Sequence, residues 1–135
     1  MATINWNDNL SVKIDSIDQQ HKKLIELVNT FYDNINLGTS KEKMMKLIKG
    51  LKEYTVFHFS TEERYMKQFN YPAYLGHKAE HDKFIETVIN YEERYKSGKL
   101  LVTIEVTNFI KDWITSHIMG TDQKYSDFLI RNGVR

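Results

Sequence analysis

The chain of 135 residues is long enough for one domain with a buried core and short for two, and its hydrophobic (41%) and charged (27%) fractions are ordinary for a globular protein. A formal net charge of +1 leaves no basic footprint for nucleic acid or an anionic membrane, and the absence of cysteine excludes disulfides, thiolate metal sites and cysteine nucleophiles. The N-terminus lacks the pattern of a signal peptide, and no apolar run approaches the roughly 18 residues that span a bilayer. We therefore expect a soluble, cytoplasmic protein with a single domain over residues 1–135 and with no nucleic-acid or membrane partner.

Residues 1–17 show no helical period and predict an extended arm that apolar side chains hold against the body. Residues 18–132 predict a helical bundle. The first helix is expected to begin near Asp18, a favourable N-cap residue, and to end at Gly38. Its apolar side chains recur at three- and four-residue steps, which gives one buried stripe with His21 at its beginning.

The second helix is expected to begin just after Ser40, which can cap it, and to end before Tyr71. Pro72 sets that limit because it disfavours helical geometry in the residue before it, and it also suits the first turn of the next helix. The third helix then carries apolar residues on one side and is expected to end at Gly98.

The fourth helix is expected from about Val102 to His117, with an indistinct start because the preceding residues are β-branched. Gly120 should break or distort it, and Thr121 or Asp122 can cap a short last helix before a solvated tail. Four amphipathic helices joined by short loops predict an all-α fold. Its architecture is an antiparallel up-down-up-down four-helix bundle with an extended N-terminal arm and a short C-terminal helix.

Histidines and carboxylates gather at one end of this predicted bundle. Two pairs have i, i+4 spacing, which places both members of a pair on one helix face. The histidines lie near the beginning of the first and third helices and near the end of the second and fourth, so antiparallel packing brings them to one level. Seven side chains are therefore expected to converge: His21, His58, Glu62, His77, His81, His117 and Asp122.

Each of these residues also has an ordinary explanation. A lone histidine on an apolar face is usually a satisfied core residue, and an i, i+4 pair is usually a surface hydrogen bond or ion pair. Together, however, five imidazoles and two carboxylates in one core layer would each cost several kcal/mol if they were unpaired. A bound metal supplies that compensation, so we interpret the set as a metal site.

The donor set also limits the choice of metal. Seven ligands exceed one tetrahedral zinc, and calcium and magnesium prefer shells of oxygen. Mixed imidazole and carboxylate ligands suit iron, with zinc, manganese, nickel or cobalt chemically possible. If both carboxylates bridge two octahedral metals beside a bridging oxygen, three histidines complete one metal and two histidines leave the other with a vacancy.

The last two ligands need a local distortion. His117 and Asp122 have i, i+5 spacing, which is about 140° of rotation on a regular helix. A bulge at Gly120 would bring Asp122 back to the same face. We therefore expect Gly120→Val to disturb the site.

These motifs and the residues around them resemble the sequences of the hemerythrin family in its bacterial single-domain form. The resemblance rests on Asp18-Gln-Gln-His21, His58-x-x-x-Glu62, Tyr71-Pro72 before His77-x-x-x-His81, and His117-Ile-Met-Gly-Thr-Asp122, and it covers about residues 4–130.

The resemblance implies reversible dioxygen binding, for storage, delivery or scavenging, at a non-haem centre of two iron ions with an oxo or hydroxo bridge. It implies that His77, His81 and His117 hold the saturated iron, that His21 and His58 hold the iron with the vacancy, and that Glu62 and Asp122 bridge. It makes dioxygen the ligand, with nitric oxide or small anions as further occupants of the open position.

The expected neighbours of the vacancy are apolar, which favours reversible binding over turnover: Leu24, Phe59, Trp113, Ile114 and Ile118. We expect a carrier rather than an enzyme, and a monomer or weak homo-oligomer. The alternatives are a module that senses oxygen, redox state or nitric oxide, and a weak di-iron enzyme of the peroxidase type.

Overall fold

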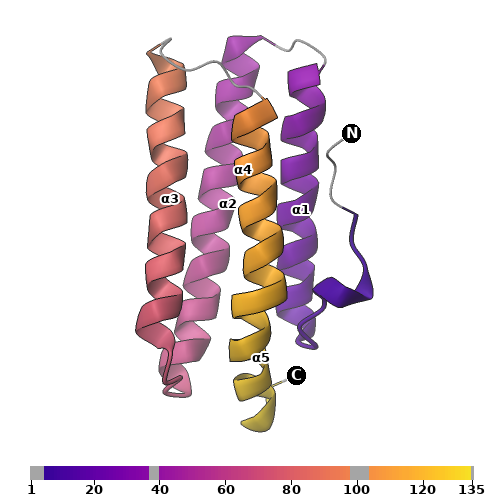
Figure 1. The fold of residues 1–135 in the computed structure, drawn as a ribbon, viewed down its shortest axis with the longest axis vertical. Coiled ribbons are helices and arrows are strands. Elements are labelled where there is room, and N and C mark those ends of the chain that lie inside the picture. The colour runs from indigo at the N-terminus through magenta and orange to yellow at the C-terminus, as the bar shows by residue number, and fades with distance from the viewer. Residues whose placement is uncertain (1–4, 37–39, 98–103, 135) are drawn as a thin grey trace.

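The computed structural model describes residues 5–36, 40–97 and 104–134, which form antiparallel helices packed side by side (Figure 1). The helices are α1 (Asp15–Asn36), α2 (Lys41–Gln68), α3 (Tyr74–Lys96), α4 (Ile104–Ser116) and α5 (Asp122–Arg131), with a 3-10 turn η1 (Asp8–Leu10) and a π-helical segment η2 (His117–Thr121). The predicted all-α four-helix bundle with a C-terminal helix is confirmed. The expected helix ends at Gly38 and Gly98, and the start near Val102, lie outside the described residues.

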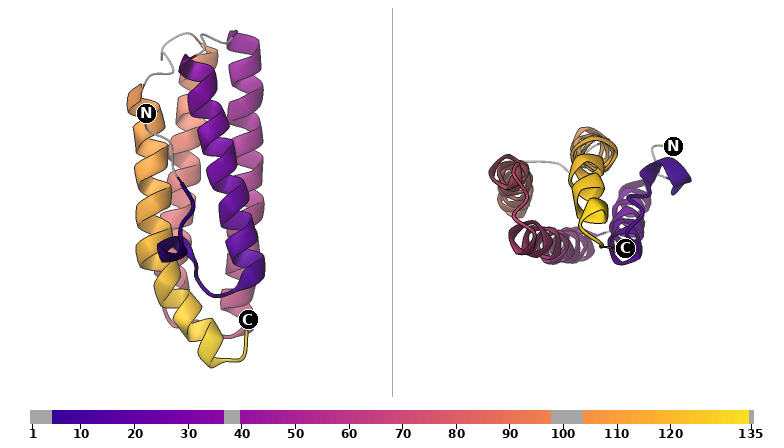
Figure 2. Two further views of the ribbon diagram at one scale, coloured as in Figure 1. Left: turned by 90° about the vertical axis from the view of Figure 1, so that its right-hand side faces the viewer. Right: turned by 90° about the horizontal axis from the view of Figure 1, so that it is seen from below.

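The N-terminal arm is shorter than predicted, because α1 begins at Asp15 rather than near Asp18. Asp18 does not cap the helix. Its carboxylate instead accepts hydrogen bonds from the Ser11 hydroxyl at 2.6 Å and the Val12 backbone N–H at 2.8 Å, which ties the arm to the first turn of α1. The arm lies across the side of the bundle formed by α1 and α4 (Figure 2).

The second helix begins as expected, since the Ser40 side chain accepts a hydrogen bond from the Lys43 backbone N–H. It ends at Gln68 for a reason that the sequence interpretation missed. Asn70 adopts a left-handed φ of 57°, and the Tyr71 N–H bonds back to the Met66 carbonyl at 2.9 Å. This is a Schellman motif, which closes the helix before Pro72 can act.

Helices α4 and α5 form one continuous rod through the π-helical segment. The predicted distortion near Gly120 is present, because the Asp122 N–H bonds to the His117 carbonyl. The predicted cap is wrong: α5 begins at Asp122, but neither the Thr121 nor the Asp122 side chain caps it, and the Thr121 hydroxyl donates to Glu80 on α3 at 2.9 Å. The tail is exposed at residues 131–133, as predicted, whereas Val134 packs against buried residues.

The core consists of two apolar clusters with a polar layer between them. The larger cluster fills most of the bundle and includes Leu24, Phe59 and Ile118. The smaller one lies at the end where α1 begins, the lower end in Figure 1, and joins the arm to α2 and α5. Its buried members are Val12, Ile14, Ile17, Met66, Tyr125 and Leu129.

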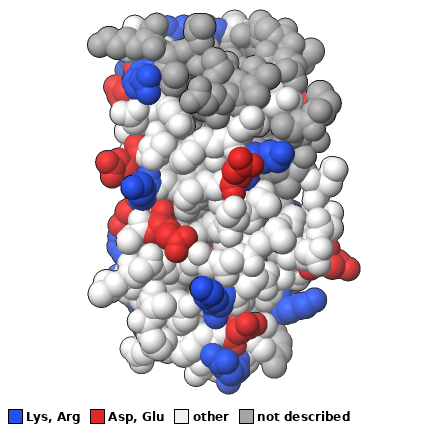
Figure 3. All heavy atoms as spheres, in the orientation of Figure 1, with Lys and Arg blue, Asp and Glu red and all other residues white. Residues whose placement is uncertain are grey.

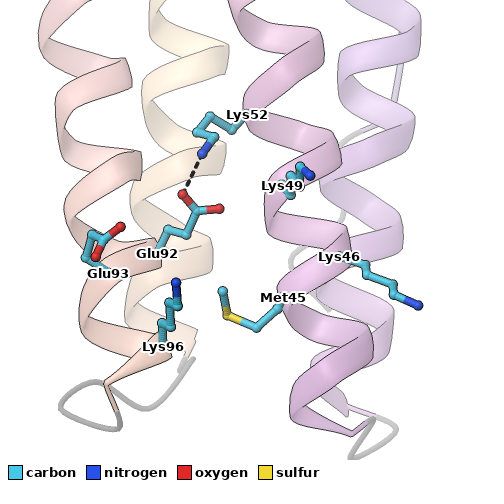
Figure 4. Close-up of a pocket in the computed structure, with 7 residues that line it drawn as sticks. All are labelled: Met45, Lys46, Lys49, Lys52, Glu92, Glu93 and Lys96. Carbon is cyan, nitrogen blue, oxygen red and sulfur yellow. Dashed lines mark hydrogen bonds and ion pairs between the residues drawn. The ribbon is translucent and has the colours of Figure 1, made fainter.

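At the other end of the bundle, a partly buried ion pair joins α2 to α3. The Lys52 ammonium lies 2.5 Å from the Glu92 carboxylate (Figure 4). On the face in Figure 3, basic and acidic side chains alternate along the described part of the bundle with broad uncharged areas between them. In the described part of the chain, every helix is too short or too polar to traverse a bilayer.

Candidate metal centre

All seven predicted ligand residues lie in the polar layer between the two apolar clusters. On α1, His21 follows Ile17 and precedes Leu24 by about one turn each; on α2, Glu62 lies between Phe59 and Met66. The side chains of the seven residues are between 0% and 4% exposed. The same helical period that builds the apolar stripes therefore points these polar groups into the core.

Three histidines form one part of the layer together with both carboxylates. The Nε2 atoms of His77 and His117 each lie 3.0 Å from Asp122 Oδ1. His81 Nε2 lies 3.3 Å from Glu62 Oε1. One ligand atom from each of these five residues falls within 4.8 Å of the others, which is compatible with a single cation.

The other two histidines form a second group that uses the same carboxylates. His21 Nε2 lies 3.2 Å from Asp122 Oδ2 and 3.8 Å from Glu62 Oε2, while His58 Nε2 lies 3.4 Å from Glu62 Oε1. Asp122 thus turns one oxygen toward each histidine group. Two carboxylates shared by two groups of imidazoles are suited to bridging a pair of cations.

The donor atoms of this layer fit a metal better than they fit each other. Both ring nitrogens of His21 and His77 and all four carboxylate oxygens of Glu62 and Asp122 are buried with no hydrogen-bond partner among the described residues. The Nε2 atoms of His81 and His117 lie 3.0 Å apart, although the Nδ1 atom of each ring already lies beside a carboxylate. Buried polar atoms left without partners carry a large desolvation cost, which coordination removes.

The electrostatics keep the carboxylates ionised inside the core. Burial alone would raise the pKa of Asp122, but His117, His21 and His77 outweigh it and hold that pKa well below its usual range. Burial disfavours a charged His81, yet Glu62 and Glu63 raise its pKa to about 9. The ionised carboxylates therefore attract positive charge into the core, whether it is carried by protons on the imidazoles or by a cation.

His58 differs from His81, because burial is the largest influence on it and lowers its pKa to about 4 despite the opposing effect of Glu62. A neutral imidazole presents a free lone pair, so His58 is poised as a ligand.

Three residues that the sequence did not single out hold the outer nitrogens of the histidines. Gln20 Oε1 lies 2.7 Å from His58 Nδ1, Glu63 Oε2 lies 2.9 Å from His81 Nδ1, and Glu80 Oε1 lies 3.2 Å from His117 Nδ1. Gln20 and Glu63 directly adjoin a predicted ligand, and Glu80 precedes His81. The sequence offered one signal for these residues, which is that each is next to a predicted ligand along the chain. That signal could not identify which histidine each side chain would contact.

The five predicted pocket residues all belong to the larger apolar cluster or pack against it. Leu24, Ile114 and Ile118 are buried in the larger apolar cluster. The Phe59 ring stacks on His81 with centroids 3.7 Å apart, and the Trp113 ring stacks on His117 at 4.4 Å. These two aromatic rings therefore orient members of the three-histidine group, and an additional role at the vacancy stays a prediction.

Tyr125 closes the layer on the side of the smaller cluster. Its ring is perpendicular to His77 with centroids 5.0 Å apart, and its side chain is fully buried. Burial, together with Glu62 and Asp122, raises the pKa of Tyr125 well above its usual value. The residue is thus a neutral phenol that seals the histidines from solvent.

A four-helix bundle with a buried, shared layer of histidines and carboxylates defines a metal-binding helical protein. The family model of the hemerythrin HHE cation binding domain matches residues 12–129. The chain belongs to the hemerythrin family.

Relatives and solved structures agree over nearly the whole length. The bacteriohemerythrin of Clostridium acetobutylicum is 38% identical over 128 residues, which cover 90% of this chain and 98% of that protein. The bacteriohemerythrin of Methylococcus capsulatus is 31% identical over 130 residues, with 96% and 98% covered. A crystal structure of wild-type hemerythrin superposes with a TM-score of 0.88 at 29% identity, covering 93% of this chain and 97% of that one.

Proposed function

We propose that this protein binds dioxygen reversibly at a non-haem di-iron centre, as a carrier, store or scavenger rather than as a catalyst. One observation carries the proposal: Glu62 and Asp122 belong both to a group with three histidines and to a group with two. Two metals held in this way have unequal numbers of protein ligands. The difference leaves room for an exogenous ligand on the side of His21 and His58.

Each residue has a defined task in this proposal. His77, His81 and His117 would hold one iron, His21 and His58 would hold the other, and Glu62 and Asp122 would bridge. When bound, the two irons supply the electrons that reversible dioxygen binding requires. The same donor set is consistent with iron because mixed imidazole and carboxylate ligands suit it.

The surroundings favour binding over turnover. Leu24, Ile114 and Ile118 are at most 2% exposed and belong to the larger apolar cluster, which borders the polar layer. Apolar surroundings that exclude water and contain no acidic side chain limit the delivery of protons to a bound oxygen ligand. They therefore favour retention of that ligand. The acids that reach the histidines from outside, Glu63 and Glu80, do so on the three-histidine side.

The test is anaerobic reconstitution of the chain with ferrous iron, followed by air and then by vacuum. We expect two irons per chain and a charge-transfer absorption that appears with oxygen and disappears under vacuum. The Asp122→Ala variant should lose the absorption, whereas Glu53→Gln, an exposed acid on α2, should keep it. An absorption that never reverses, or steady turnover of peroxide well above autoxidation, would favour the enzymatic alternative instead.

A further inference from the structure

The two histidine groups differ in the atoms that hold their outer ring nitrogens. In the three-histidine group, His81 faces the Glu63 carboxylate and His117 faces the Glu80 carboxylate. In the two-histidine group, His58 faces the neutral amide of Gln20 at 2.7 Å. Two of the three histidines in one group are therefore backed by carboxylates, and one of the two in the other group is backed by an amide, whereas the Nδ1 atoms of His77 and His21 have no partner among the described residues.

This difference changes the strength of the ligands. A carboxylate that accepts the outer N–H of an imidazole makes the opposite nitrogen a stronger donor and fixes the ring toward the metal. A hydrogen bond to a charged acceptor is also roughly twice as strong as one between neutral groups. The Gln20 amide orients His58 but adds no negative charge.

The two carboxylates are not equally effective. The Glu63 side chain is 18% exposed, whereas the Glu80 side chain is 48% exposed and is held in place by the Thr121 hydroxyl. Solvent screens a charge more when it is exposed. We therefore expect Glu63 to contribute the larger share.

A surface cleft reaches one member of the three-histidine group. A cleft of about 300 Å³ between α2 and α3 is lined by both Glu63 and His81, with Asp82 and Lys78 beside them. Lys78 is paired with Asp82 at 2.7 Å, so its charge is partly neutralised. A cation that enters this cleft meets Glu63 and the His81 ring before any member of the other group.

We propose that the two metal positions fill in order, the three-histidine position first, and that Gln20, Glu63 and Glu80 are positioning residues that set the difference in affinity. This inference rests on the two-metal site proposed above. The larger number of histidines favours the same order. Exchanging the outer acceptors while leaving all seven ligands intact separates the two contributions.

The experiment titrates the metal-free full chain with Co²⁺ and counts bound ions by native mass spectrometry. In the wild type, a species with one cobalt should dominate at half saturation. That species should persist in His21→Ala and be lost in His117→Ala. Glu63→Gln should weaken the first step by about 10- to 100-fold, and Glu53→Gln, on the same helix, should not.

The reverse exchange guards against a simple folding defect. Gln20→Glu should strengthen the second step and reduce the one-cobalt species, a gain that a misfolded chain cannot produce. Two cobalt ions bound with unchanged affinities in both Glu63→Gln and Gln20→Glu would overturn this inference alone. A wild-type chain that stops below two cobalt ions would overturn the two-metal site and this inference with it.

Discussion

At the residue scale, residues with a positive φ determine local structure that the spacing of apolar residues does not predict. Lys13 and Asn70 both adopt positive φ values, 64° and 57°. Asparagine tolerates this region better than most residues, and at Asn70 it closes α2. The sequence pattern instead predicts that Pro72 ends the helix. A Schellman motif is hard to recognise in a sequence when the left-handed residue is not glycine.

We predict that Asn70→Ala lowers the free energy of unfolding by about 1 kcal/mol, because the left-handed conformation is less favourable for alanine than for asparagine. Asn70→Gly should stay close to wild type in chemical denaturation. The two variants remove the same side chain, so equal losses in both would mean that the side chain matters rather than the backbone conformation.

The Lys52–Glu92 pair offers a second test at the same scale. Its side chains are 25% and 12% exposed, between the extremes for which pairs contribute nothing or several kcal/mol. A double-mutant cycle of Lys52→Gln and Glu92→Gln should give a coupling of about 1 kcal/mol. Because solvent partly screens this pair, the coupling should shrink when salt rises from 0.05 M to about 1 M; a value independent of salt would contradict this assignment.

At the element scale, the fold and the convergence of the seven side chains were predictable because both follow from helical period. Apolar residues every three or four positions predict the helices, and polar intrusions at matching ends predict one layer. The start of α1 was not predictable in the same way. Asp18 has the character of an N-cap, and only the position of the arm shows that Ser11 and Val12 use its carboxylate.

We predict that Asp18→Asn costs about 1 kcal/mol of stability, the typical net value of a hydrogen bond to a side chain. Hydrogen exchange at the Val12 amide should speed up more than exchange within α3. Asp15→Asn provides the matched control, since Asp15 is an exposed acid in the same helical turn. Equal acceleration in both variants would point to a general charge effect on the helix N-terminus instead.

The π-helical segment calls for a revision of the expected role of Gly120. A Cβ built at Gly120 meets nothing within 4 Å, and the residue has no positive φ. The i→i−5 hydrogen bond of Asp122, rather than glycine flexibility, brings Asp122 to the face of His117.

Gly120→Ala should therefore raise the free energy of unfolding, by up to about 1 kcal/mol, since alanine is the better helix former. Metal stoichiometry should stay that of the wild type. Gly120→Val, expected from the sequence to disturb the site, should now act mainly through its β-branched side chain and lose less than Asp122→Ala does. Loss of metal in Gly120→Ala would restore the original interpretation.

At the scale of the whole molecule, the polar layer lies between two apolar clusters. Among the described residues, the groups that support the proposed metal site lie in this layer or directly against it. The outer acceptors could not be assigned from sequence, because which histidine a surface glutamate or glutamine reaches depends on rotamers and helix rotation. Gln20, for example, lies on α1 yet contacts His58 on α2.

We therefore expect bound metal to link the helices at the layer between the two clusters and to stabilise the folded chain. A ligand that binds only the folded chain stabilises it by about 4 kcal/mol at a free concentration a thousandfold above its Kd. For a domain of this size each kcal/mol corresponds to roughly 3 °C, so saturation with Fe²⁺ or Co²⁺ should raise Tm by about 10 °C, and chelation should reverse the rise. Asp122→Ala removes a carboxylate shared by both groups and should strongly reduce this rise in Tm. A rise as large as that of the wild type would mean that the cations bind elsewhere on the chain, because the core layer would no longer offer two complete sets of ligands.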